Sequence, residues 1–225
     1  MNKILSNYNE ILKQIRSCRS KLNGKYCEPE LIAVSKQFPK EIIQILVNTG
    51  HKTFGENKVQ EAQSKWVDLK KENPEKNLEL HLIGPLQSNK ANLALEIFDV
   101  IQTVDREKIA LKLNKYLAEK TDINKKKFFI QVNIGNEKQK SGVEERFAEQ
   151  FFQWCSNDLS LNIIGLMCIP PLDKTPEPFF RRLRSLCDRF NLKHASMGMT
   201  NDFKAAIDHG ATFIRVGTGI FGKRN

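Results

Sequence analysis

The chain has 225 residues, of which 40% are hydrophobic and 28% are charged. This composition supports a sizeable buried core and excludes a largely disordered protein. A single α/β barrel commonly takes roughly 200 to 250 residues, so we expect one domain spanning residues 1–225.

The formal net charge is +10, from 36 Lys and Arg against 26 Asp and Glu. An excess of positive charge attracts the phosphates of nucleic acids. The lysines are dispersed, however, and the only dense run, Lys125 to Lys127, directly precedes an apolar segment without interleaved aromatic residues. We therefore expect a solvated charged surface and no nucleic-acid partner, and we keep a nucleic-acid-associated protein as the weaker alternative.

The cysteines and the apolar runs bear on the cellular compartment. The five cysteines form no CxxC or other metal-ligand spacing, and their number is odd: Cys18, Cys27, Cys155, Cys168 and Cys187. This pattern indicates neither a disulfide framework nor a zinc site. Because no signal peptide and no run of about 18 apolar residues is present, we expect a cytoplasmic protein with reduced thiols and no membrane partner.

The predicted elements alternate along the chain. Ile4, Tyr8, Ile11 and Ile15 share one helical face, which predicts a helix over residues 2–22. Eight short β-rich segments follow, with helical spacing between them: 30–36, 52–56, 79–84, 100–105, 127–134, 161–169, 194–198 and 213–217. Eight strands alternating with helices predict an α/β fold, a single (β/α)8 TIM barrel preceded by an extra helix.

The proline-rich segment PPLDKTPEP, residues 170–178, follows the sixth predicted strand. Its prolines interrupt both helix and strand, so we expect a loop there. In a barrel this loop lies on the carboxyl-terminal face, where functional residues gather.

Lys36 ends the first predicted strand, in the stretch LIAVSK. A lysine amine in apolar surroundings loses proton affinity, which frees its lone pair to attack a carbonyl group and form a Schiff base. The alternative is that Lys36 begins the loop before Pro39 and points to solvent.

Two glycine-rich turns follow the last two predicted strands, at SMGMTND (196–202) and RVGTGIFG (215–222). In TIM barrels the loops at these positions often bind phosphate through backbone N–H groups. The alternative is that the glycines only close turns and that Thr200 or Asp202 caps the next helix. Taken with Lys36, the turns favour a phosphate-bearing carbonyl compound as ligand, either pyridoxal phosphate or a sugar phosphate of a Schiff-base aldolase.

Several motifs, in one order along residues 31 to 222, give the chain a resemblance to the pyridoxal phosphate homeostasis protein family. They are AVSK (33–36), FGEN with VQEA (54–62), HLIGPLQSNK (81–90), VDR (104–106), QVNI (131–134), KSGV (140–143), GLM.IPP (165–171), SMGM (196–199) and IRVGTGIFG (214–222). The resemblance implies a single barrel like that of alanine racemase, with pyridoxal 5′-phosphate as its cofactor.

The resemblance also assigns roles to residues that match the motifs. Lys36 would form a Schiff base with the aldehyde, Arg215 would face the pyridine nitrogen, and Asn57 would lie close to the cofactor. A helix N-cap is the alternative for Asn57. The phosphate would be held by Ser196, Gly198, Gly217 and Thr218. Lys58 and Asn92 depart from the family pattern, and we expect both on helices.

The implied function is intracellular vitamin B6 homeostasis, with the cofactor held on Lys36 and without robust catalytic turnover. A guanidinium keeps its protons, so Arg215 leaves the pyridine nitrogen unprotonated and weakens the cofactor as an electron sink. An amino-acid racemase is the alternative, although a racemase of this fold takes its second acid/base from a second domain. The implied partners are pyridoxal phosphate and the apoenzymes that receive it, and we expect a monomer.

Three histidines, His51, His81 and His194, occur singly and without an acidic or cysteine companion at ligand spacing. We expect ordinary hydrogen-bonded histidines and no metal site.

Overall fold

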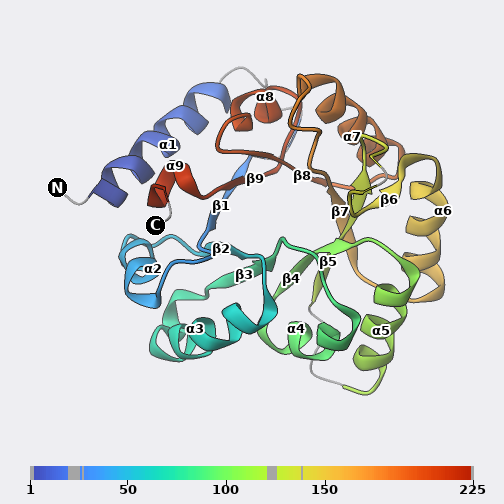
Figure 1. The fold of residues 1–225 in the computed structure, drawn as a ribbon, viewed down its shortest axis with the longest axis horizontal. Helices are drawn as coiled ribbons and strands as arrows, with labels where there is room; N and C mark the ends of the chain where they lie inside the picture. The colour runs from blue at the N-terminus through green and yellow to red at the C-terminus, as the bar shows by residue number, and fades with distance from the viewer. Residues whose placement is uncertain (1–2, 20–25, 27, 121–125, 138, 224–225) are drawn as a thin grey trace.

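A computed structural model describes residues 3–19, 26, 28–120, 126–137 and 139–223. Eight parallel strands form a closed barrel with helices around it (Figure 1). The predicted (β/α)8 barrel is therefore confirmed. Its strands are β1 (Glu30–Val34), β2 (Thr53–Glu56), β3 (Glu79–Leu82), β4 (Val100–Val104), β5 (Lys127–Asn133), β7 (Ile163–Met167), β8 (His194–Met199) and β9 (Phe213–Val216).

The barrel closes where β1 pairs with β9 and where β4 pairs with β5. All pairs around the ring are parallel, as crossover helices require. A further strand, β6 (Val143–Glu144), pairs with β5 outside the ring. The sequence did not predict β6, because two residues are too few to show a period.

The helices cover the outside of the barrel. They are α1 (Lys3–Arg19), α2 (Lys40–Val47), α3 (Val59–Glu72), α4 (Ala91–Ile97), α5 (Glu107–Ala118), α6 (Ala148–Gln153), α7 (Glu177–Arg189), α8 (Phe203–Asp208) and α9 (Thr218–Phe221). The predicted first helix is confirmed over Lys3–Arg19, while its remaining positions, 2 and 20–22, lie outside the described residues. Helix α1 packs on α8 and α9 through a buried face that includes Ile11 and Ile15.

The apolar core has two parts, because strand side chains alternate between the two faces of the sheet. Inside the barrel lie Ile32, Val34, Ile83, Val100, Phe129, Met167 and Phe213. A larger cluster fills the layer between the strands and the helices, with Trp66 and Phe180 among its fully buried side chains.

Two local predictions are wrong. The loop after β7 was predicted to reach residue 178, but it ends at Pro176, and Pro178 lies in the first turn of α7. Proline is tolerated there because backbone N–H groups in the first turn of a helix have no partner within the helix. Lys58 is the extended N-cap residue of α3, with φ of −129°, so it lies before the helix. The N-cap alternative for Asn57 is therefore wrong, because Lys58 occupies that position. The prediction that Asn92 lies on a helix is confirmed by its place in α4.

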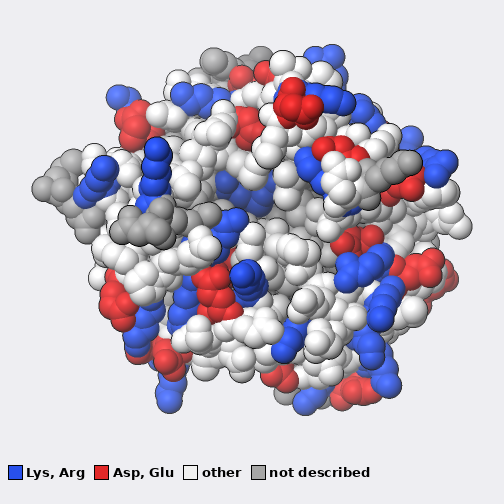
Figure 2. All heavy atoms as spheres, viewed as in Figure 1, with Lys and Arg blue, Asp and Glu red and all other residues white. Residues whose placement is uncertain are grey.

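Charges of both signs are interspersed over the face shown in Figure 2. In the predicted lysine run, Lys126 donates a hydrogen bond to the carbonyl of Phe98 at 2.7 Å, and Lys127 forms an ion pair with Glu79 at 2.7 Å. Lys125 lies outside the described residues. This arrangement agrees with a dispersed, partly paired surface charge.

No helix within the described parts of the chain has the length and apolar character needed to cross a lipid bilayer. Four cysteines, Cys18, Cys155, Cys168 and Cys187, are buried free thiols. Cys27 lies outside the described residues.

Candidate functional site

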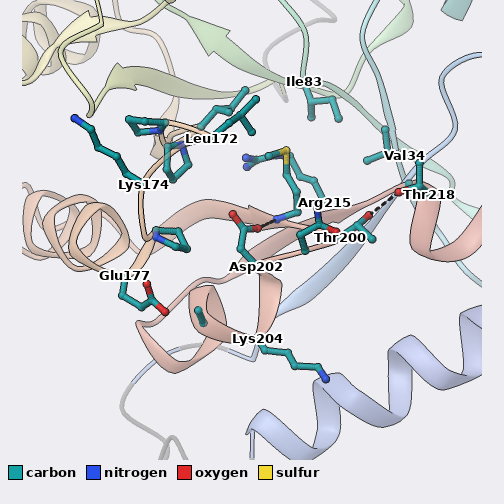
Figure 3. A pocket seen from close by; sticks show the side chains of 18 of the residues that line it. Val34, Ile83, Leu172, Lys174, Glu177, Thr200, Asp202, Lys204, Arg215 and Thr218 are labelled. Carbon is teal, nitrogen blue, oxygen red and sulfur yellow. Dashed lines mark hydrogen bonds between the residues drawn. The ribbon is translucent and has the colours of Figure 1, made fainter. Parts of the chain in front are cut away.

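A cavity of about 690 Å³ opens at the carboxyl-terminal ends of the barrel strands (Figure 3). Its walls come from segments that end or follow β1, β2, β3, β7, β8 and β9. Five of the seven predicted site residues line it: Lys36, Asn57, Arg215, Gly217 and Thr218. Segments far apart in the sequence therefore meet at one site, as the barrel topology predicts.

Lys36 lies on a tight turn directly after β1. The N–H of Phe38 donates to the carbonyl of Ser35 at 3.1 Å, which closes the turn around Lys36. Lys36 itself is half-buried, and the neighbouring cavity wall includes the apolar side chains of Val34 and Ile83. This position shelters a lysine side chain at the cavity while keeping it accessible.

The turn after β9 offers several donors to an anion. Gly217 is the N-cap of α9 and Thr218 begins the helix, so the N–H groups of Thr218 and Gly219 have no partner within the helix, while those of Ile220 and Phe221 bond to the carbonyl of Gly217. The hydroxyl of Thr218 donates to that of Thr200 at 3.3 Å, from the loop after β8. A Cβ at Gly219 would lie 3.0 Å from Thr200 Cγ2, so glycine permits this close approach. Two hydroxyl groups beside the N–H groups of Thr218 and Gly219 suit the oxygens of a phosphate.

Arg215 is a buried cation at the cavity, with 4% of its surface exposed. Its Nη1 donates to Ser196 Oγ at 2.7 Å and its Nη2 donates to the carbonyl of Cys168 at 2.8 Å. Burial lowers the pKa of Arg215, with Cys168 and Asp202 opposing the shift. The guanidinium still carries its charge at neutral pH, because arginine is protonated far above that range.

Ser196 and Gly198 are not among the residues that line the cavity. The hydroxyl of Ser196 donates to Gln102 Oε1 at 2.6 Å and accepts from Arg215, so both its donor and an acceptor position are in use. Gly198 has φ of +89° and packs against α8, where an added Cβ would lie 2.5 Å from the Cβ of Ala206. The geometry therefore gives no support to the prediction that these two residues hold the phosphate.

The cavity also includes residues to which the sequence assigned no definite role. Thr200, for which the sequence offers the role of a helix cap, lies at the cavity beside Thr218. Asp202 is the N-cap residue of α8, but its carboxylate accepts the N–H of Met199 at 2.5 Å. Val34, at the end of β1, and Ile83, directly after β3, belong to the apolar cluster inside the barrel and line the cavity, which the period of two in β-strands could have indicated.

The three histidines that the sequence analysis discussed are hydrogen-bonded, as expected. His51 contacts Tyr8 and Thr53, while His81 contacts Glu79 and Gln102. His194 Nδ1 lies 3.3 Å from the hydroxyl of Thr212. Within the described residues, no group of three or more His, Cys, Asp and Glu side chains could hold a metal ion.

A second cavity, of about 710 Å³, lies between the start of α5 and the region of α6. It contains none of the predicted site residues. The convergence of Lys36, Arg215 and the Thr200–Thr218 pair therefore selects the first cavity as the candidate site.

The fold and the site define a (β/α)8 barrel protein with a lysine in the turn after its first strand and a glycine-containing turn after its last, both at one cavity. The sequence matches the family described as "Alanine racemase, N-terminal domain" over residues 6–225.

Curated relatives named pyridoxal phosphate homeostasis protein match along nearly their whole length. The relative from Aquifex aeolicus (strain VF5) is 36% identical, with 95% of each chain covered. The relative from Escherichia coli (strain K12) is 35% identical, with 100% of this chain and 98% of the relative covered. The chain therefore belongs to the family of pyridoxal phosphate homeostasis proteins, and the predicted resemblance is confirmed.

Solved structures agree with this assignment. PipY of Synechococcus elongatus PCC7942 has been solved without and with PLP bound, and the two structures match with TM-scores of 0.78 and 0.76 at 34% and 33% identity. Each match covers 93% of this chain and 99% of PipY. An alanine racemase from Clostridium difficile 630 shares the fold, with a TM-score of 0.70 at 13% identity over 57% of its length.

Proposed function

We propose that this protein binds pyridoxal 5′-phosphate in the first cavity, with Lys36 bonded covalently to it, and serves vitamin B6 homeostasis. The observation that carries the proposal is the arrangement of Lys36, Arg215 and the Thr200–Thr218 pair on one cavity. The names of the curated relatives and the PipY structure with PLP bound support it.

The bound cofactor supplies an aldehyde carbon that condenses with an amine, with loss of one water molecule, and a phosphate that anchors it. Lys36 provides the amine from the turn after β1. The hydroxyls of Thr200 and Thr218 and the first N–H groups of α9 bind the phosphate. Asn57, which lines the cavity after β2, completes the polar wall.

Arg215 favours holding the cofactor over using it. Its guanidinium can donate a hydrogen bond to the pyridine nitrogen but does not transfer a proton to it. An unprotonated pyridine withdraws electrons weakly, which disfavours reactions that build up negative charge on a bound amino acid. We therefore propose storage and delivery of the cofactor to apoenzymes as the main role, in a cytoplasmic, single-domain monomer.

The shared fold leaves amino-acid racemisation as the alternative function. It predicts exchange of the Cα proton of single L-amino acids in heavy water, measured by NMR, at a rate well above that of free pyridoxal phosphate. The storage role predicts exchange no faster than with the free cofactor.

The covalent site is tested by mixing the pure protein with pyridoxal phosphate, recording the visible spectrum, reducing with borohydride and mapping the modified residue by mass spectrometry. We expect the label on Lys36 and its loss in Lys36→Ala. Lys174→Ala removes another lysine that lines the cavity and should keep the label on Lys36. A label found on a residue other than Lys36 in the wild-type protein, and kept there at full yield in Lys36→Ala, would overturn the assignment.

A further inference from the structure

A second lysine, Lys65, contacts the turn that carries Lys36. Lys65 lies in α3 and is 7% exposed. Its Nζ donates to the carbonyl of Ser35 at 2.9 Å and to that of Phe38 at 3.1 Å. One ammonium group therefore binds the main chain on both sides of Lys36.

Glu61, one helical turn earlier in α3, contacts the same turn. Its Oε1 accepts the backbone N–H of Gln37 and also lies 2.9 Å from Lys65 Nζ. Gln37 has φ of +66°, in the left-handed region that a residue with a side chain adopts only when its surroundings favour it. We name Lys65 and Glu61 the turn clamp.

Buried charges hold the turn clamp in place. Glu56, fully buried at the end of β2, lies 2.9 Å from Lys65 Nζ and accepts hydrogen bonds from Ser35 Oγ and Trp66 Nε1. Burial raises the pKa of Glu56, and the charge of Lys65 opposes that shift. Burial would also raise the pKa of Glu61, but the Gln37 N–H and Lys65 outweigh it and the pKa is lowered.

Lys65 is thus engaged with two carbonyl groups and two carboxyl groups, whereas Lys36 lines the cavity. We propose that the turn clamp consists of positioning residues, which fix the backbone from Ser35 to Phe38 so that the Lys36 amine is presented to its ligand. The ligand's identity rests on the proposed function, while the clamping of the turn does not. Loosening this turn slows covalent capture, because a displacement of about 1 Å at a reacting group can cost about 100-fold in rate.

The test uses variants that separate positioning from folding. Lys65→Met alone would leave the buried Glu56 carboxyl without its cation, so it is combined with Glu56→Gln. Glu61→Ala removes the acceptor of the Gln37 N–H from a side chain that is 25% exposed, and Glu61→Gln keeps an acceptor oxygen there. Lys70→Met is the matched control, because Lys70 is an ion-paired lysine of α3 that binds Asp99.

Two measurements are made on each variant. The first, on the protein without cofactor, is amide hydrogen exchange of Gln37 by NMR. The second is the rate constant for borohydride-trappable capture of pyridoxal phosphate on Lys36. In Glu61→Ala and in the double variant Lys65→Met/Glu56→Gln, we expect the amide hydrogen of Gln37 to exchange at least about 10-fold faster than in wild type. We expect capture of pyridoxal phosphate on Lys36 to be about 10- to 100-fold slower. Glu61→Gln should fall between Glu61→Ala and wild type, and Lys70→Met should stay within about twofold of wild type.

Unchanged exchange and capture in Glu61→Ala would overturn the turn clamp, whether or not the double variant folds. An equal loss in Lys70→Met would also overturn it, since a general effect of α3 stability would then account for the result. If wild-type protein captures no cofactor on Lys36, the proposed function fails, while the exchange of Gln37 still decides whether the turn is clamped.

Discussion

Gly198 is a backbone position at which both conformation and close packing favour glycine, and it does not line the first cavity. Its φ of +89° lies in the left-handed region, and a Cβ there would approach Ala206 Cβ to 2.5 Å and Phe203 Cα to 3.0 Å. Gly50 has a similar φ of +87°, but a Cβ added there would have no atom within 4 Å. The two glycines therefore separate backbone strain from steric overlap.

We expect Gly198→Ala to lower the free energy of unfolding by about 2 to 4 kcal/mol, from strain and overlap together. Gly50→Ala adds backbone strain without steric overlap and should lower the free energy of unfolding by about 1 kcal/mol. Urea unfolding of both variants measures the two values. Equal losses would show that α8 moves away from residue 198 without cost.

Helix α1 is joined to the barrel by a hydrogen-bonded histidine. Tyr8 Oη lies 3.1 Å from His51 Nδ1, and His51 Nε2 lies 2.8 Å from the carbonyl of Thr53. Because a carbonyl only accepts, Nε2 carries the proton and Nδ1 accepts from the tyrosine hydroxyl. Burial lowers the pKa of His51 to about 4, and the hydrogen bond to Thr53 partly opposes this shift.

This lowered pKa predicts a pH dependence of stability. Between pH 6.5 and about 4 the unfolded chain binds a proton at His51 that the folded protein does not, so the free energy of unfolding falls as the pH falls. The contribution is fully present above pH 6.5, and its loss by pH 4 is at most roughly 3 kcal/mol. The free energy of unfolding, measured with urea at pH values from 7 to 4, should decline less steeply in His51→Gln than in wild type. His194, whose pKa is also lowered to about 4 by burial, remains in both proteins, so identical declines would contradict the role of His51.

A chain of hydrogen bonds crosses the barrel interior and ends at the cavity. Each side chain donates to the next, in the order Arg215, Ser196, Gln102, His81 and Glu79, over distances of 2.6 to 2.8 Å. Burial would raise the pKa of Glu79, but His81 and Lys127 lower it to about 2. A carboxylate at the amino-terminal end of the barrel is thus linked to the cation at the opposite end.

We expect Ser196→Ala to lower the free energy of unfolding by about 1 to 3 kcal/mol, because Arg215 Nη1 and Gln102 Oε1 each lose a buried partner. Ser64→Ala, which removes an exposed hydroxyl bonded to the carbonyl of Glu61, should change it by less than about 0.5 kcal/mol. Chemical denaturation measures both. A neutral Ser196→Ala would mean that Arg215 is held by the carbonyl of Cys168 alone.

The sequence by itself determined the alternation of strands and helices, the lysine after β1 and the glycine turns after β8 and β9. Each of these is a pattern within a short run of residues, and parallel topology then brings the strand ends together. Only the tertiary structure decided the roles of Ser196 and Lys65. Ser196 stands in a glycine-rich motif but faces Gln102 and Arg215 inside the barrel, and Lys65 resembles a surface lysine until α3 packs against the Lys36 turn. Their partners lie 19 to 94 residues away in the sequence, and contacts at that range depend on how the elements pack.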